Sequence, residues 1–431
     1  MNGSADASPV PSPAPAGERR RIFVLLALTM LLYFFANFQR TVIPGTIFSE
    51  LQHDFDASAA GITGLGASFM YLYAVSQLFS GVLADRFGGY RLITVGGALF
   101  CLGSLLFPLS HNLPQLYGCR LLTGLGASAI YLSMVKEIQR ACPANFALTL
   151  GVGMLVGYAG SMAANAPFVA AIRVTGWRLG LIGVGAVLAA LWGIFVVLRF
   201  TVKLPPPGTT PFRIRAFAPA TKKRHNWALY LLTGLAFAVF YTFQTVLGKK
   251  FLEDHCGMTA IAAGWVMTLS GALSALASFL TPVLSKFCGD RRRPFMRFMG
   301  LGTLLCTAGP LLAIAADRHW AWFFCGAFLV LACCSNMGPI FMALVAETNP
   351  VEHLGVCASF ANCLAYLMVA LLGNLAGVLM DLFEPAIVDG VRVYGARSYL
   401  AVFALCTAVG ATAFALSLTV KETRGRPLEV R

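Results

Sequence analysis

Apolar residues along this chain gather in long unbroken runs that do not alternate with polar residues. Twelve such runs recur, each of roughly 20 residues, which is the length that a helix needs to cross a hydrocarbon core about 30 Å thick. Transmembrane strands would instead be about ten residues long with alternating polarity. The pattern therefore predicts an all-α membrane protein with twelve transmembrane helices, whose approximate limits are Ile22–Ile43, Ala60–Leu83, Leu92–Leu109, Leu113–Val135, Phe146–Ile172, Leu179–Phe200, Trp227–Leu247, Met258–Leu284, Phe295–Ala316, Trp320–Val345, Gly355–Met380 and Tyr399–Val420.

Composition and charge agree with a membrane location. Hydrophobic residues make up 58% of the chain, charged residues make up 12%, and the mean hydropathy is +0.74. The polar residues are too few to cover a soluble surface, so lipid is the expected surroundings. Most of the cations behind the net charge of +14 fall on one side of the predicted helices, which predicts a bacterial-type inner-membrane protein with both termini cytoplasmic. These cations are then expected to set the orientation of the helices in the membrane and to contact membrane lipid. Nucleic acid is not an expected partner.

The chain divides at a basic, proline-rich segment, residues 201–226, which is expected to be a cytoplasmic linker. Residues 1–21, rich in Ser, Ala and Pro, are expected to form a disordered cytoplasmic N-terminus, and residues 421–431 a cytoplasmic tail. Residues 22–200 and 227–420 then form two six-helix bundles. Short echoes between them pair Asn37–Gln39 with Thr242–Gln244 and Val135–Glu137 with Val345–Glu347. They predict pseudo-symmetric halves with a binding site between them near the midplane.

The loop after the second predicted helix, "GVLADRFGGYRLI", carries a recognisable motif. Its residues Gly81, Asp85, Arg86, Gly88 and Arg91 resemble the loop 2–3 signature of the major facilitator superfamily, G-x-x-x-D-R-x-G-[RK]-[RK], although Gly89-Tyr90 displaces one expected cation. The fourth helix adds Arg120, Gly124 and Gly126, which are similar to the family's R-x-x-x-G-x-G. The resemblance covers essentially the whole chain and implies a transporter that works by alternating access.

The resemblance implies that the loop 2–3 motif is an inner gate. Asp85 is expected to interact with the positive end of a helix dipole, and Arg86 or Arg91 is expected to pair with Glu137 at the end of the fourth helix. Gating residues are therefore Gly81, Asp85, Arg86, Gly88, Arg91 and Glu137. The alternative is a positive-inside turn with a topological role only.

Arg40 lies in the outer half of the first apolar run. A charge at membrane depth costs about 2.5–3.5 kcal/mol on insertion scales and normally faces a protein interior or a watery cavity. The resemblance places the first helix along the central cavity, where a guanidinium can hold a carboxylate through two hydrogen bonds. The expected substrate-binding residues are Arg40, Gln39, Asn37, Gln244, Asn165 and Arg120. The alternative for Arg40 and for Arg120 is snorkelling to the membrane surface.

The other polar residues of the predicted helices indicate no further functional site directly. No Asp, Glu or His falls in the middle third of any predicted helix, so no buried proton carrier is visible. Asn336, Asn362 and Asn374 are candidates for the wall of the second half or for interhelical hydrogen bonds. The glycine-rich segment "GVGMLVGYAG" of the fifth helix indicates close helix packing, because no strand precedes it as a nucleotide loop would require.

The outer loops of the two halves carry residue types that bind transition metals. These are Glu50, His53, Asp54 and Asp56 in one loop and Glu253, Asp254, His255 and Cys256 in the other. Pseudo-symmetry would have to bring the loops together for a metal role, and solvated helix ends are the simpler interpretation. No cofactor is expected, and the twelve cysteines include no C-x-x-C that would indicate a zinc or disulfide framework.

These observations favour a monomeric secondary transporter of a small polar, anionic or zwitterionic solute. Three alternatives stay open: a drug or metabolite exporter, in which Arg40 would be dispensable, a transporter linked to a transition metal, and a transporter-like sensor or assembly factor. An enzyme is not expected, because no nucleophile, metal site or acid–base pair stands out at membrane depth.

Overall fold

The computed structural model describes residues 16–202, 218–350, 353–388 and 390–426. The N-terminal half contains α1 (Ala16–Thr41), a short π-helical segment η1 (Val42–Thr46), α2 (Phe48–Phe55), α3 (Ala59–Phe87), α4 (Gly89–Leu106), η2 (Phe107–Leu109), α5 (Leu113–Ala141), η3 (Pro143–Asn145), α6 (Phe146–Ala163), α7 (Ala166–Thr175) and α8 (Trp177–Arg199). The C-terminal half contains α9 (Ala218–Lys222), α10 (Arg224–Thr242), the π-helical η5 (Phe243–Leu247), α11 (Gly248–Asp254), α12 (Ala260–Phe287), α13 (Arg293–Ala315), α14 (Ala321–Ser335), α15 (Gly338–Thr348), α16 (Leu354–Met380), the antiparallel hairpin β1 (Ala386–Val388) and β2 (Val391–Val393), and α17 (Ala396–Leu418).

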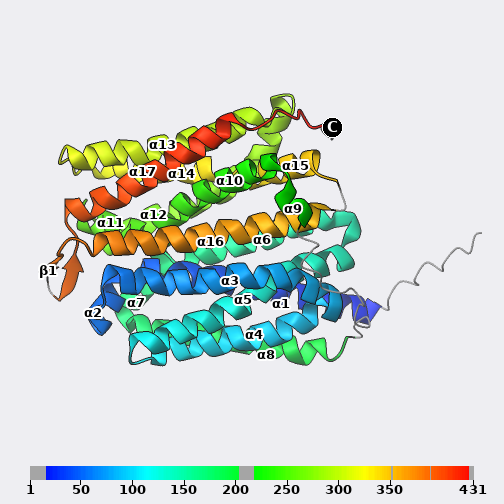
Figure 1. The fold of residues 1–431 in the computed structure, drawn as a ribbon. Coiled ribbons are helices and arrows are strands. Elements are labelled where there is room, and N and C mark those ends of the chain that lie inside the picture. The colour runs from blue at the N-terminus through cyan, green and yellow to red at the C-terminus, as the bar shows by residue number, and fades with distance from the viewer. Residues whose placement is uncertain (1–15, 203–217, 351–352, 389, 427–431) are drawn as a thin grey trace, which may run out of the picture.

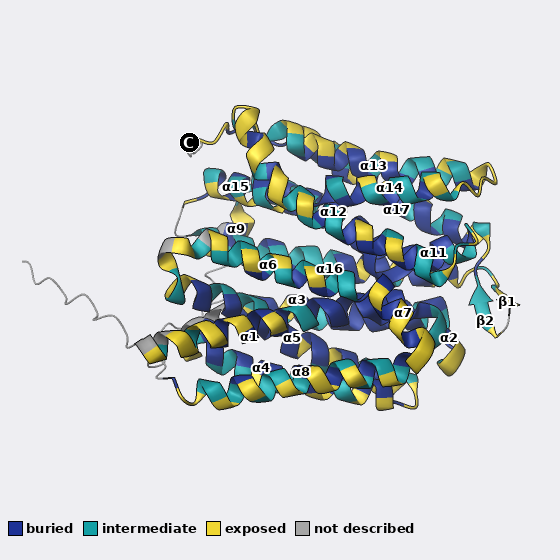
Figure 2. Cartoon of the chain, turned by 180° about the vertical axis from the view of Figure 1, so that it is seen from behind, coloured by how far each residue is buried: buried dark blue, intermediate teal, exposed yellow. Residues whose placement is uncertain are grey.

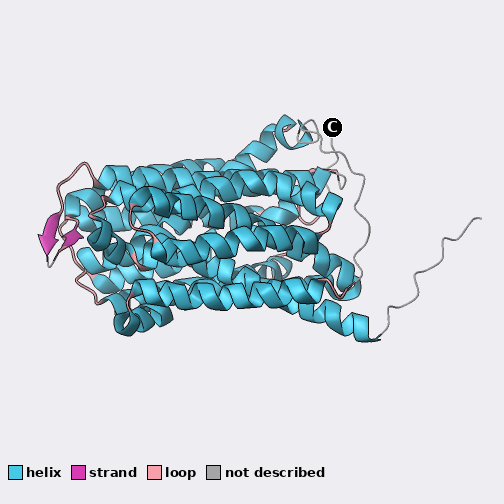
Figure 3. Ribbon diagram, turned by 90° about the horizontal axis from the view of Figure 1, so that it is seen from below, coloured by secondary structure: helices cyan, strands magenta, loops and turns pink. Residues whose placement is uncertain are grey.

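The described chain is a bundle of long, roughly parallel helices in two halves (Figure 1). Among the described residues, eleven helical spans are long and apolar enough to cross a membrane, and there are twelve when α6 and α7, which are bent by 44° relative to each other, are taken as one span. The halves meet along two seams, one where α3 packs on α16 and one where α6 and α7 pack on α12. The β1–β2 hairpin and the C-terminus lie at opposite ends of the bundle (Figures 1 and 3). We call these the hairpin end and the terminal end. The prediction of an all-helical membrane fold is confirmed.

Large apolar side chains cover the outside of the bundle, as a lipid environment requires. Val174, Val197, Leu312 and Phe287 are among those exposed on the outward faces of the helices, and exposed positions recur along α8 and α13 (Figure 2). A soluble monomer does not tolerate contiguous apolar surface on this scale. The buried polar residues gather instead between the helices.

Several spans are broken where the sequence pattern predicts one continuous helix. The predicted run Phe146–Ile172 is divided into α6 and α7, and the run Trp320–Val345 is divided into α14 and α15. Pro167 and Pro339 follow the breaks, and Pro44 lies inside η1 next to the non-helical Ile43. Proline lacks the N–H that would continue the helix and its ring displaces the preceding turn, which explains all three breaks.

The ends of the described segments also differ from the predicted boundaries. α1 begins at Ala16, so residues 16–21 are helical and not disordered as expected. Residues 1–15 of the predicted N-terminus and residues 203–217 of the predicted linker lie outside the described residues. In the rest of the linker α9 occupies Ala218–Lys222, and α10 begins at Arg224, before the predicted boundary.

Candidate functional site

A cavity of about 250 Å³ lies between the two halves, near the middle of the long helices. The N-terminal half contributes residues of α1, α3, α5 and α6, and the C-terminal half contributes α10, η5, α12, the α14–α15 break and α16. The lining residues are Tyr33, Asn37, Arg40, Thr41, Tyr73, Tyr131, Met154, Tyr158, Ser161, Phe237, Phe240, Tyr241, Gln244, Thr245, Gly271, Ser274, Asn336, Gly338, Asn362 and Tyr366. They include one cation and no carboxylate.

Arg40 extends into this cavity and is only 8% exposed. Its Nη1 donates to the hydroxyl of Tyr366 at 2.9 Å, and its Nη2 donates to the side-chain oxygen of Asn37. The rings of Tyr241, Tyr366 and Tyr73 lie 5.3, 5.5 and 6.0 Å from its guanidinium carbon, close enough for cation–π attraction. No carboxylate of the described residues lies within salt-bridge distance, and Nε has no hydrogen-bond partner among them. The snorkelling alternative for Arg40 does not fit this position.

Arg120 holds the backbone of the first span at the break that follows Arg40. It is fully buried, and its three nitrogens donate to the carbonyls of Gln39, Ile43 and Leu65 at 3.0 to 3.2 Å. The irregular η1 segment leaves carbonyls without the usual helical N–H partner, and a buried carbonyl without a partner is costly. Arg120 therefore neither snorkels nor lines the cavity, so its predicted place among the substrate-binding residues does not match the geometry. Its contacts instead set the direction in which α1 presents Arg40.

The remaining predicted substrate residues divide into two groups. Asn37 and Gln244 line the cavity together with Arg40. Gln39 and Asn165 do not: Gln39 is buried away from the cavity and its Nε2 has no acceptor among the described residues, while Asn165 donates to the carbonyl of Ser161 at the α6–α7 break. Of the three asparagines considered for the second half, Asn336 and Asn362 line the cavity.

The sequence analysis missed the tyrosines, which form much of the cavity wall. Tyr33, Tyr73, Tyr131, Tyr158, Tyr241 and Tyr366 come from six helices, four in the N-terminal half and two in the C-terminal half. A single sequence does not show whether a tyrosine in an apolar run faces lipid, a neighbouring helix or a cavity, so it is a weak indicator of a cavity wall. One signal was present: Tyr33, Asn37 and Arg40 recur at helical spacing on one face of α1.

The halves are joined at the hairpin end by a carboxylate. Asp381, at the end of α16, accepts hydrogen bonds from the backbone N–H groups of Ala59 and Ala60 at 2.8 and 2.7 Å. These are first-turn amides of α3, where a helix lacks internal acceptors and favours negative charge. Arg392 of the hairpin also pairs with Asp56 of the other half at 2.7 Å. Together these contacts close the hairpin end of the α3–α16 seam.

At the terminal end, the predicted gating residues are arranged differently from the expectation. Glu137 pairs with Arg140 at 3.3 Å and accepts from the backbone N–H of Tyr90, not from Arg86 or Arg91. Arg91 donates to the Phe87 carbonyl, and the Arg86 guanidinium lies over the Phe87 ring. The expected pairing of Glu137 with the motif cations is therefore wrong in this conformation. Gly88 has φ +88° and makes the α3–α4 turn that favours glycine.

Gly81 belongs to α3, and the side chain of Asp85 lies outside the described part of the structure, so the predicted contact of Asp85 with a helix terminus stays a prediction.

The terminal end of the C-terminal half has its own network of charges. Glu422 accepts from the backbone N–H groups of Arg292 and Arg293 at 2.8 and 3.1 Å, and Arg292 pairs with Glu347 at 2.9 Å. Partial burial alone would raise the pKa of Glu422, but the backbone N–H bonds outweigh it and hold that pKa below its usual value. The tail therefore acts as the N-terminal cap of α13.

The outer-loop residues do not come together as a metal site. Within the described ranges, no three His, Cys, Asp or Glu side chains gather in a way that would hold a metal ion. Asp254 instead pairs with Lys250 and accepts from the hydroxyl of Tyr399, while Asp54 accepts from the indole N–H of Trp177. The metal hypothesis is contradicted by these partners, which are structural.

Comparisons with known proteins agree with this architecture. The sequence model of the Major Facilitator Superfamily matches residues 29–371 and, in a second match, residues 229–430. The glucose transporter GlcP of Staphylococcus epidermidis is 24% identical over 444 residues, which cover 95% of this chain and 95% of that protein. Multidrug resistance protein D of Escherichia coli is 27% identical over 328 residues, covering 71% of this chain and 74% of that protein.

A solved structure is similar over nearly the whole chain. The crystal structure of a bacterial homologue of the human lysosomal transporter Spinster, in an inward-facing and unoccupied conformation, superposes with a TM-score of 0.75. The identity is 18%, and the match covers 97% of this chain and 100% of that chain, which shows a shared fold. This chain therefore belongs to the major facilitator superfamily and is a multi-pass membrane protein of the secondary-transporter class.

Proposed function

We propose that this protein transports a small organic anion, with a carboxylate held by Arg40 in the cavity between the halves. The observation that supports this is a buried guanidinium with no carboxylate partner among the described residues. An unpaired charge in a low-dielectric site is costly, and an anionic solute supplies the missing partner. Arg40 lines the cavity, and each of its two Nη atoms carries a second N–H beyond the one donated to Tyr366 or Asn37, from which a bound carboxylate can accept.

The charge balance of the cavity favours a solute with a single negative charge. One cation and no carboxylate line the space, so a dianion such as an organic phosphate would bring an excess negative charge into it. The tyrosine rings and the amides of Asn336 and Asn362 provide surfaces for the uncharged part of the solute. An exporter of amphipathic drugs would not need the guanidinium, and the same experiment tests that alternative.

The distribution of cations indicates how the protein is oriented in the membrane. We expect the terminal end to face the cytoplasm of an inner membrane, because the described cations Lys222 and Lys223 and the segment Arg291–Arg293 lie in the connections at that end. The hairpin end would then face the outside. Fusions of a reporter enzyme that is active only outside the cytoplasm test this, and high activity at residue 426 would contradict it.

The experiment for the transported solute is uptake into liposomes that contain the purified protein. A panel of radiolabelled monocarboxylates, amino acids, organic phosphates and D-glucose is compared for wild type, Arg40→Ala and the control Arg173→Gln, an exposed cation. We expect monocarboxylate uptake to fall at least about tenfold in Arg40→Ala only, since charge-assisted hydrogen bonds contribute roughly 1.5–3 kcal/mol each. Uptake that persists in folded Arg40→Ala would refute the assignment.

A further inference from the structure

Resting on the proposed function, we infer that the preferred solute is an aromatic monocarboxylate, whose ring packs against a cluster of aromatic side chains beside Arg40. The cavity is lined by twenty residues, and these include six of the twelve tyrosines of the chain together with Phe237 and Phe240. An aliphatic carboxylate would need Arg40 but would make no use of so many rings.

Three of the lining rings lie directly beside the cation. The rings of Tyr241, Tyr366 and Tyr73 lie 5.3, 5.5 and 6.0 Å from the guanidinium carbon of Arg40. Tyr241 on α10 and Tyr366 on α16 belong to the C-terminal half, and Tyr73 on α3 belongs to the N-terminal half. A carboxylate that accepts from Arg40 therefore has rings of both halves next to the atoms bonded to it.

These rings and Phe237 pack on one another, and we call the four the aromatic cluster. The centroid of Tyr366 lies 4.9 Å from that of Tyr73 and 5.6 Å from that of Phe237, and Phe237 lies 4.7 Å from Tyr241. All four side chains line the cavity. Phe237 and Tyr366 are only half-buried, so they offer a solute more ring surface than Tyr73 and Tyr241, which are buried.

The cavity has room for one ring together with its carboxylate. Its volume is about 250 Å³, and an apolar protein cavity of about 150 Å³ is large enough to bind benzene. The space left beside a phenyl ring is therefore sufficient for a carboxylate that reaches Arg40.

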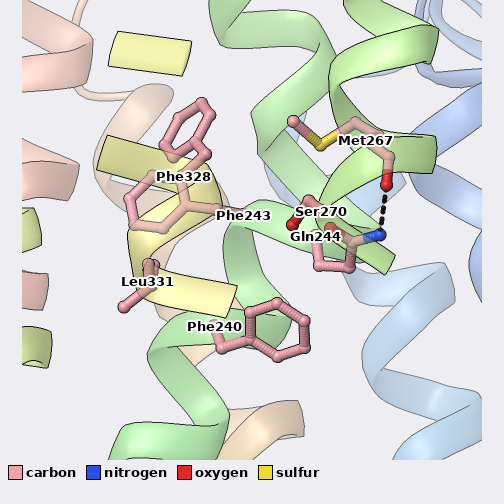
Figure 4. Close-up of a pocket in the computed structure, with 7 residues that line it drawn as sticks. All are labelled: Phe240, Phe243, Gln244, Met267, Ser270, Phe328 and Leu331. Atoms are coloured by element: carbon pink, nitrogen blue, oxygen red, sulfur yellow. Dashed lines mark hydrogen bonds between the residues drawn. The ribbon is translucent and has the colours of Figure 1, made fainter. Parts of the chain in front are cut away.

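Packed side chains close the cavity on the side of η5, as Figure 4 shows. Phe240 and Gln244 line both the cavity and a second pocket inside the C-terminal half, and this pocket has no space for a water molecule. Gln244 Nε2 also donates to the carbonyl of Met267 on α12 at 2.9 Å, which holds the amide in place. The ring of the solute therefore stays on the cavity side of Phe240, where the aromatic cluster lies.

The charge of Arg40 and the rings together define the solute class. An aromatic cation would be attracted to the rings, but Arg40 would repel it, and no carboxylate of the described residues lines the cavity to offset that repulsion. A neutral aromatic solute would leave the buried charge of Arg40 without an anionic partner. An aromatic anion satisfies both the guanidinium and the rings.

Aromatic rings attract one another beyond what the burial of apolar surface provides, by a factor of about 2 to 10 in a binding constant for each pair. Burial alone gives the opposite order for a matched saturated ring. A cyclohexyl group has more C–H surface than a phenyl group, so it gains more from leaving water. A preference for the phenyl ring therefore reports the rings of the cavity and not its apolar character.

The test measures dissociation constants by isothermal titration calorimetry on the purified protein in detergent. The ligands are benzoate, cyclohexanecarboxylate and propionate at pH 7, where all three are anions. They are compared for wild type, Phe237→Leu, Tyr366→Leu, Tyr366→Phe and the control Tyr71→Leu, a half-buried tyrosine of α3 that does not line the cavity. Melting temperatures confirm that each variant is folded.

We expect wild type and Tyr71→Leu to bind benzoate about 2- to 10-fold more tightly than cyclohexanecarboxylate, and to bind propionate more weakly than either. Loss of a ring in Phe237→Leu or Tyr366→Leu should lower the ratio of the two constants by a factor of at least about two. Tyr366→Phe keeps the ring and should keep the ratio, although it lacks the hydroxyl that accepts from Arg40.

Three results would overturn the inference and leave monocarboxylate binding at Arg40 in place. The first is equal or tighter binding of cyclohexanecarboxylate by wild type, the second is tighter binding of propionate than of benzoate, and the third is a ratio that is unchanged in both folded leucine variants. The proposed function itself fails instead if folded wild type binds none of the three anions, or if folded Arg40→Ala binds benzoate as tightly as wild type.

Discussion

Asp381 gives the most direct prediction about how the halves separate. Its carboxylate accepts two hydrogen bonds, at 2.8 and 2.7 Å, from first-turn amides of α3 across the α3–α16 seam. In Asp381→Asn one oxygen becomes an NH₂ group that cannot accept, and the negative charge is lost. One hydrogen bond of this kind contributes about 1 kcal/mol and the charge at a helix N-terminus roughly 0.3–1 kcal/mol. Because Asp381 is exposed to solvent, we expect the substitution to weaken the closed α3–α16 seam by about 1.4 kcal/mol in total. That loss changes the equilibrium constant between the closed and the open seam by a factor of ten.

Hydrogen–deuterium exchange measures this contact at the amides that make it. The N–H groups of Ala59 and Ala60 are the donors, so we expect them to exchange about tenfold faster in Asp381→Asn than in wild type. The matched control is Asp317→Asn, an exposed carboxylate near the same end that pairs only within its own half. It should leave the exchange of Ala59 and Ala60 unchanged.

Unchanged exchange at Ala59 and Ala60 in Asp381→Asn would refute the reasoning, because the carboxylate would then make no net contribution to closing the seam. Equal acceleration in Asp317→Asn would mean that general loss of negative charge, and not the contact with α3, was responsible.

Two further predictions concern stability. Arg120→Leu leaves the carbonyls of Gln39 and Ile43 at the η1 break without the donor that Arg120 supplies, whereas the Leu65 carbonyl still accepts from the hydroxyl of Ser68. We therefore expect a loss of at least about 2 kcal/mol, read as a lower melting temperature in detergent. Arg120→Lys should recover only part of it, since an ammonium lacks the planar fork of donors, and full recovery would contradict the backbone-clamp role. Glu422 has a lowered pKa in the folded state, so its contribution to stability is present above the unfolded value of about 4.3 and is lost as pH falls through the folded value. The melting temperature of Glu422→Gln should therefore lie below that of wild type at pH 7, and the two should converge only when acidification carries the pH well below about 4.3; a constant difference would contradict the capping role.

The predicted fold was confirmed because continuous apolar runs of membrane length determine it directly. Those runs cannot reveal where a span breaks. The breaks at η1, between α6 and α7 and between α14 and α15 follow from prolines, but neighbouring side chains must satisfy the backbone groups that each break exposes. Pro282 and Pro310, by contrast, lie inside α12 and α13 without dividing them, so the residue type alone does not decide the outcome.

The residues of the candidate site were also only partly predictable from the sequence. Arg40, Asn37 and Gln244 were identified because polar residues are rare and expensive inside apolar runs. Asn165 and Arg120 carried the same signal but donate to backbone carbonyls, and Gln39 is buried outside the cavity. A sequence shows that a buried polar group needs a partner, and it does not show whether that partner is a carbonyl or a solute.

The sequence by itself determined the membrane environment, the helical class, the twofold organisation and the family resemblance, since each depends on patterns along the chain. Only the tertiary structure decided that six tyrosines line the cavity into which Arg40 extends, that Arg120 supports the backbone behind Arg40, and that Asp381 contacts α3 in the other half. Those contacts join residues up to hundreds of positions apart, and they depend on how the two halves pack, which local hydropathy does not encode.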